Sequence, residues 1–132
     1  ASNNDLDMLG EMRTAAFVAK GFGHNPSLLP ASMVLRMATI NGARALGIEE
    51  ETGSLEIGKS ADVVALDLGQ PETQPVYHPV SQILYAAGRH QVRHVWIAGQ
   101  HLLNKGVLTS LDLPEILARA RLWRSRIAPD RP

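Results

Sequence analysis

The 132-residue sequence contains no cysteine, which excludes a disulfide framework and any thiolate metal site. It also lacks an excess of charge of either sign, because 13 Lys and Arg balance 13 Asp and Glu. A neutral chain gives no support to nucleic acid or an anionic membrane surface as a partner. No apolar run is long enough to span a bilayer, and no signal peptide is recognisable. We therefore expect a cytoplasmic protein.

Hydrophobic periodicity predicts two helices in the first 50 residues. The first is expected from Leu6 to Lys20, with Asn4 or Asp5 accepting hydrogen bonds from its first turn. The second is expected from Ala31 to Leu46. The Asn-Gly pair that ends at Gly42 is typical of a hairpin turn, but no alternating strands flank it. We interpret Gly42 as a close-packing position within the second helix.

The second half of the chain is predicted to hold β-structure and two more helices. Adjacent valines followed by alternation indicate a strand, and three prolines within nine residues make the next segment irregular. A final helix is amphipathic, with apolar residues at helical spacing. In order, we expect a strand at 61–68, a short helix opened by Pro79, a hairpin at 92–106 with its turn at Ala98-Gly99-Gln100, and a helix at 111–127 capped by Asp112.

The stretch GSLEIGKS, from Gly53 to Ser60, matches the phosphate-loop pattern G-x-x-x-x-G-K-[ST]. A phosphate loop needs a strand before it and a helix after it, so that the helix N-terminus faces the phosphate. Here a helix is predicted before the stretch and a strand after it. We therefore reject a nucleotide site and interpret Gly53 and Gly58 as turn residues, with Lys59 exposed and without a chemical role.

Three other groups of polar residues have a functional and a structural interpretation. His94 and His101, on opposite arms of the predicted hairpin, can approach each other, but zinc needs further ligands, so surface histidines are favoured. Asp5, Asp7 and Glu11 suggest a divalent-ion site, yet capping of the first helix explains them better. A solvated face is favoured over nucleic-acid contact for the arginines of the last helix, Arg119, Arg121, Arg124 and Arg126.

Four stretches resemble the C-terminal region of metal-dependent amidohydrolases, in the right order. Gly53–Asp67 resembles the family signature G-S-L-E-x-G-K-x-A-D-x-V-x-x-D, and Leu35–Gly47 resembles its last barrel-side helix. Val92–Gly106 resembles the closing hairpin, and Ser2–Ala16 the segment after the eighth barrel strand. SNNDLDM, EMRTAA and ETQPVYHPVSQILYAAGR are most similar to 5′-methylthioadenosine/S-adenosylhomocysteine deaminases. Triazine hydrolases and guanine-type deaminases share much of this region.

The resemblance implies an α/β fold: the C-terminal fragment of a (β/α)8 amidohydrolase barrel, plus part of a small β-sandwich. Residues 1–50 would form the last barrel loop and helices. Residues 51–110 would form part of the sandwich, with a proline-rich loop and a short helix. Residues 111–132 would form the C-terminal helix and tail.

The resemblance also implies a hydrolytic deaminase whose zinc is held by an H-x-H pair, two further histidines and an aspartate. This sequence has no H-x-H, and the family's aspartate would fall just before Ala1. We therefore expect the 132 residues alone to be inactive and to bind no metal. The implied partners are the remainder of the barrel, a purine nucleoside substrate and further copies of the enzyme.

By the same resemblance, Ser2, Asn3 and Asn4 follow the metal-binding aspartate, so an amide there would contact substrate or orient that carboxylate. Helix capping is the alternative interpretation. A second hypothesis for the chain is a non-catalytic α+β interaction module. Such a module would melt cooperatively as a monomer, whereas an amidohydrolase fragment is expected to aggregate or melt poorly.

Overall fold

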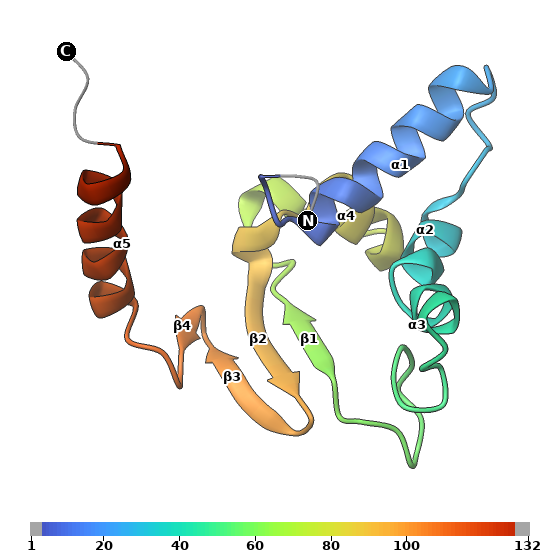
Figure 1. Ribbon diagram of the computed structural model, residues 1–132. Helices are drawn as coiled ribbons and strands as arrows, with labels where there is room; N and C mark the ends of the chain where they lie inside the picture. Colours follow the sequence, from blue (N-terminus) through green and yellow to red (C-terminus); the bar gives the residue numbers. More distant parts are fainter. Residues whose placement is uncertain (1–3, 129–132) are drawn as a thin grey trace.

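The computed structural model describes residues 4–128 and consists of helices around a small antiparallel sheet (Figure 1). In chain order, the first elements are α1 Met8–Phe22, α2 Ala31–Met37, α3 Ile40–Leu46, β1 Val63–Leu66 and a 3-10 turn η1 Pro71–Thr73. They are followed by α4 Pro79–Tyr85, a second 3-10 turn η2 Arg89–Gln91, β2 Val92–Ile97, β3 Gln100–Asn104, β4 Val107–Leu108 and α5 Leu113–Ile127. None of the helices in this range is long and apolar enough to cross a membrane.

The buried core lies among α1, α2 and α4, beside the sheet rather than within it. Its members are apolar residues of different sizes, namely Met12, Ala16, Ala31, Val34 and Leu84. A polar contact fastens the same helices, because the guanidinium of Arg13 on α1 donates to the carbonyl oxygens of Leu84 (3.0 Å) and Ala87 (2.5 Å). Leu84 lies in the last turn of α4, where the carbonyls have no partner within the helix, and Ala87 lies just beyond that end. Arg13 thus fixes α1 against the end of α4.

The prediction of one helix from Ala31 to Leu46 is wrong, because the segment forms two helices with a break at Ala38 and Thr39. Thr39 has non-helical dihedrals (φ −123°, ψ −107°), and its hydroxyl donates to the carbonyl of Leu35 at 2.7 Å. A threonine side chain that bonds the preceding turn competes with the helical ladder. The close-packing interpretation of Gly42 is confirmed, since a Cβ there would lie 3.1 Å from the Met37 carbonyl oxygen.

The sheet is antiparallel in the order β1-β2-β3-β4. The predicted hairpin is confirmed, and its turn residues Ala98 and Gly99 both have positive φ, 48° and 77°. Two such residues match the right-handed twist of paired strands. Asp62 fastens the turn to the start of β1, because its Oδ1 accepts from the Ala98 N–H at 2.8 Å. The strand predicted at 61–68 is shorter, covering only residues 63–66.

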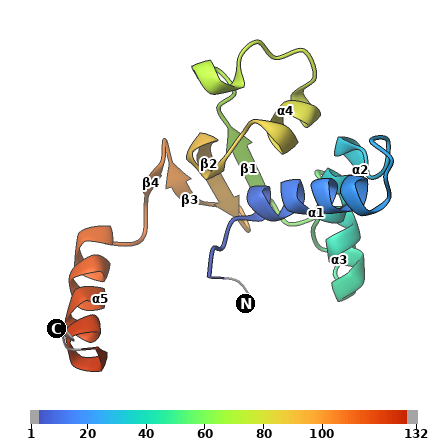
Figure 2. The same cartoon turned by 90° about the horizontal axis from the view of Figure 1, so that it is seen from above.

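The last helix stands apart from the helical core and the sheet (Figures 1 and 2). Its predicted cap is confirmed, since Asp112 Oδ1 accepts from the Glu115 N–H at 3.0 Å, but none of its residues is buried. The open arrangement exposes 9891 Å² of surface, whereas a compact protein of 14.3 kDa exposes about 6,800 Å². The surface exceeds that of a compact protein by about 3,100 Å².

Candidate functional site

The segment just before α1 is the candidate functional site, because the resemblance places it beside the catalytic metal. The structure makes Asp7 the helix cap: its Oδ1 accepts from the N–H groups of Leu9 (3.1 Å) and Gly10 (3.2 Å). The expectation that Asn4 or Asp5 caps this helix is therefore wrong. The helix begins at Met8, and only the residue directly before it can reach the free N–H groups of the first turn.

Arg89, the first residue of η2, connects this segment to the end of the helical core. Its guanidinium is hydrogen-bonded to the carboxylate of Asp5, and its Nε lies 3.5 Å from Asp7 Oδ2. The hydrogen bond and charge of Asp5, followed by the charge of Asp7, raise the pKa of Arg89. Both Arg89 and Asp5 are 59% exposed, so the pair contributes orientation more than stability. Capping and this ion pair account for both carboxylates without a divalent ion.

The turn that carries Arg89 is fixed by a buried glutamine. Gln91 is 1% exposed; its Oε1 accepts from the Gly88 N–H at 2.7 Å, and its Nε2 donates to Glu72 Oε1 at 2.7 Å. His90 Nε2 lies 3.1 Å from the same carboxylate oxygen. The pKa of Glu72 is lowered, first by its own backbone N–H and then by His90. These contacts hold η2, and with it Arg89, against η1.

Sequence reasoning named Ser2, Asn3 and Asn4 but missed Arg89 and Gln91. Ser2 and Asn3 lie outside the described residues, and Asn4 lies in an exposed bend directly before Asp5. Their proposed role stays a prediction. Nothing in the pattern around Arg89 marked it as a contact of the N-terminal segment, because 84 residues separate it from Asp5.

The two hairpin histidines meet, as predicted, on one face of the sheet. His94 Nδ1 lies 3.1 Å from His101 Nε2, and both rings stack on Trp96, with centroids 5.5 and 4.5 Å away. Two imidazoles are too few for a zinc site. Across residues 4–128, no group of three or more His, Asp or Glu side chains could hold a metal ion. The histidine pair alone therefore does not make up a zinc site.

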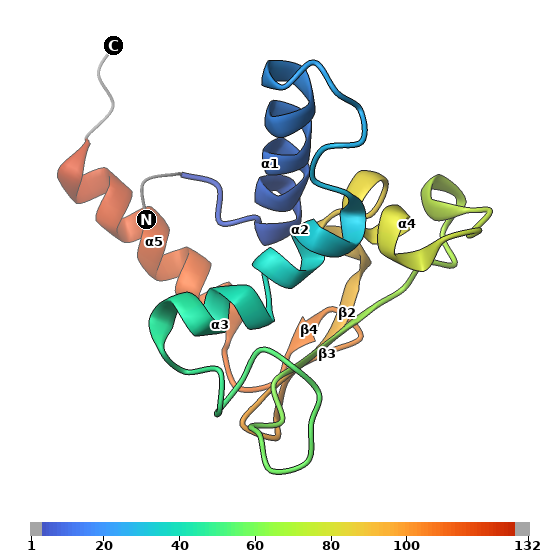
Figure 3. The same ribbon diagram turned by 90° about the vertical axis from the view of Figure 1, so that its right-hand side faces the viewer.

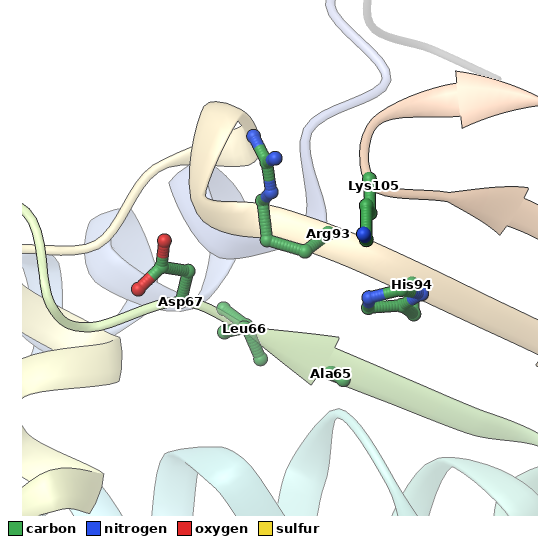
Figure 4. Close-up of a pocket in the computed structure, with 6 residues that line it drawn as sticks. All are labelled: Ala65, Leu66, Asp67, Arg93, His94 and Lys105. Atoms are coloured by element: carbon green, nitrogen blue, oxygen red, sulfur yellow. The ribbon is translucent and has the colours of Figure 1, made fainter.

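An open depression of about 350 Å³ lies beside this pair, between β1 and β2 (Figure 4). Asp67 at its edge accepts from the Gln70 side chain (2.9 Å) and the Gly69 N–H (2.8 Å), and these bonds, with the charge of Arg93, lower its pKa. The lining has no hydroxyl or thiol nucleophile. It consists of Ala65, Leu66, Asp67, Arg93, His94 and Lys105.

The stretch GSLEIGKS forms a loop between α3 and β1, so the element that directly follows it is a strand and not a helix (Figure 3). The rejection of a phosphate loop is therefore confirmed, and Gly53 and Gly58 have φ of 92° and 96°, as turn glycines do. The expectation that Lys59 is exposed is wrong. Its side chain is 12% exposed, and its Nζ donates to the Glu49 carbonyl (2.5 Å) and to Ser54 Oγ (2.8 Å). Lys59 holds the loop closed, because its ammonium group donates hydrogen bonds to oxygen atoms on the inner side of the loop.

Comparison with known proteins places this geometry in a family. The amidohydrolase family model matches residues 1–102, so the chain belongs to the amidohydrolase family. It is 44% identical over 131 residues to the 5-methylthioadenosine/S-adenosylhomocysteine deaminase of Teredinibacter turnerae, covering 99% of this chain and 30% of that protein. Members of this kind are hydrolases that act on C–N bonds, and the resemblance stated from the sequence is confirmed.

Two solved structures match the coordinates. An adenosine deaminase from Xanthomonas campestris with bound zinc superposes with a TM-score of 0.92 at 53% identity, over 96% of this chain and 29% of that one. A zinc complex of an atrazine chlorohydrolase from Arthrobacter aurescens superposes with a TM-score of 0.79 at 28% identity, over 86% and 25%. The α/β fold class is confirmed. The chain spans less than a third of the length of each relative.

Proposed function

We propose that this chain is the C-terminal part of a zinc-dependent amidohydrolase that deaminates an aminopurine nucleoside of the 5′-methylthioadenosine/S-adenosylhomocysteine type. The reaction replaces the amino group on the purine carbon with oxygen from water and releases ammonia. The rest of the protein supplies the metal ligands and the substrate pocket. The identity of 44% to the Teredinibacter relative, over 99% of the chain, carries the proposal.

Within this proposal, the residues of the chain support the active site from one side. Residues 1–50 form the last barrel loop and helices, 51–110 a part of the small sandwich, and 111–132 the C-terminal helix and tail. In this proposal, Ser2, Asn3 and Asn4 contact the substrate or orient the metal-binding carboxylate. Arg89 is a positioning residue, because it contacts the two carboxylates that directly follow this loop. The cytoplasmic location and homo-oligomeric assembly remain predictions.

The test is a chimera in which this chain replaces the matching segment of the Teredinibacter relative, with the unmodified relative as control. The chimera is expected to bind zinc and to release ammonia from 5′-methylthioadenosine. A chimera that folds and binds zinc, but stays inactive where the relative is active, would contradict the proposal.

A triazine hydrolase is the second candidate, favoured by the match of 0.79 in TM-score to the atrazine chlorohydrolase. A second chimera places the chain in that enzyme instead. Loss of atrazine hydrolysis there, with deamination retained in the first chimera, supports the deaminase. The opposite pattern supports the triazine hydrolase. If neither chimera folds and the isolated chain melts sharply as a monomer, the non-catalytic interaction module is the better description.

A further inference from the structure

The last helix carries an apolar stripe that the rest of the described chain leaves uncovered. Successive residues of a helix turn by about 100°, so these side chains fall within a stripe about 120° wide. Its members are Leu113, Ile116, Leu117, Ala120, Trp123 and Ile127. Five of them are large apolar residues between 42% and 78% exposed. An amphipathic stripe of this width is typical of a helix that buries one face.

No residue of α5 is buried, and the helix stands clear of both the sheet and the helical core (Figures 1 and 2). The position of α5 is nevertheless reproduced in an intact protein. The match to the Xanthomonas structure covers 96% of this chain, which leaves about five residues outside it, and α5 alone has 15. A TM-score of 0.92 over that length requires most of α5 to superpose. Something outside the matched part therefore holds the helix in place.

We propose that the apolar stripe of α5 docks on the remaining part of the amidohydrolase polypeptide. This inference rests on the proposed function, since it takes the chain to be one part of such an enzyme. The length of the matching structure argues for this occupant over a second copy of the chain. The chain covers only 29% of the Xanthomonas protein, so most of that polypeptide lies outside the match and can cover the stripe.

The charges beside the stripe define the chemistry of the docking surface. Arg119 flanks one edge of the stripe and Arg121 the other, and the same spacing puts Arg124 within its width. Arg126 lies over the ring of Trp123, 5.5 Å from its centroid. A surface that receives α5 therefore presents apolar side chains together with carboxylates, both at its rim and opposite Arg124. Trp123 is the expected anchor, because tryptophan is enriched among residues that dominate binding energy.

Two leucines of α5 provide a matched pair of variants. Leu117 lies in the stripe and is 49% exposed, whereas Leu122 lies on the opposite side of the helix and is 54% exposed. Both substitutions, Leu117→Ala and Leu122→Ala, make the same chemical change in the same helix. The chain is co-expressed with the portion of the Teredinibacter relative outside the match, and the dissociation constant of the two polypeptides is measured by dilution in the ultracentrifuge. Deaminase activity is read in parallel.

Leu117→Ala is expected to weaken association about 10-fold or more, and Leu122→Ala to leave it unchanged. Backbone amides of α5 are expected to exchange more slowly in the complex than in the isolated chain. If the unsubstituted pair assembles and is active but both variants bind equally well, the docking inference is overturned and the proposed function stands. If Leu117→Ala instead abolishes self-association of the chain, the occupant is a second copy. If the unsubstituted chain fails to assemble where the relative's own segment succeeds, both are overturned.

Discussion

The isolated 132-residue chain is expected not to unfold cooperatively, because it covers too little of its own apolar surface. Its exposed area exceeds that of a compact protein of the same mass by about 3,100 Å². More than half of a protein's surface is apolar, so most of this excess is apolar area that a compact domain would have buried. The net stability of a compact domain is only about 5–15 kcal/mol, so a loss of apolar burial on this scale is expected to prevent independent cooperative folding.

Differential scanning calorimetry and circular dichroism of the purified chain test this expectation. A cooperative domain of this length would absorb about 90 kcal/mol on unfolding near 60 °C. We expect a broad transition with much less heat, together with aggregation. The chimera with the Teredinibacter relative is the control, since the same residues are covered there. A sharp transition with the full enthalpy, equal to the van't Hoff value, would refute the reasoning.

Three smaller perturbations are measured in that chimera. Gln91→Met removes the donor to Glu72 and the acceptor of the part-buried Gly88 N–H, so urea unfolding should show a loss of about 1–3 kcal/mol. Unchanged stability would contradict the argument from the burial of Gln91. The hydrogen bond from the Ala98 N–H is the main cause that lowers the pKa of Asp62 in the folded protein. The stability that the Asp62 carboxylate contributes is therefore present above its pKa in the unfolded chain and is lost as pH falls through its pKa in the folded protein. Asp62→Asn should flatten the decline of stability below about pH 4, and equal slopes for the variant and the unsubstituted protein would refute this. Arg89→Ala breaks an exposed ion pair, so the midpoint of urea unfolding should barely change, but hydrogen exchange before α1 should be faster. Unaltered exchange would argue against a positioning role.

Local signals in the sequence predicted several elements correctly. The cap Asp112 followed by Pro114 marks the start of α5, and alternating apolar residues around Gly99 mark the hairpin. These signals work because capping and tight turns depend on residues a few positions apart. The order of helix, loop and strand around GSLEIGKS was likewise sufficient to reject a phosphate loop.

Local sequence patterns gave wrong predictions where the same residues are compatible with more than one local structure. Both Asp5 and Asp7 can cap a helix, and the pattern alone chose too early a start for α1. Thr39 interrupts a periodic apolar run because its side chain bonds the preceding turn. Lys59 looked like a turn residue exposed to water, but the loop folds back so that carbonyl and hydroxyl oxygens surround its ammonium group.

The sequence by itself determined the family, the hairpin and the start of the last helix, because these follow from residue spacing and local hydrogen bonding. Only the tertiary structure decided that Arg89 contacts the segment before α1 and that Gln91 is buried against Glu72. It also decided that the apolar stripe of α5 faces no other element of the described chain. Such contacts join residues far apart in the chain, and no local pattern encodes which distant groups meet.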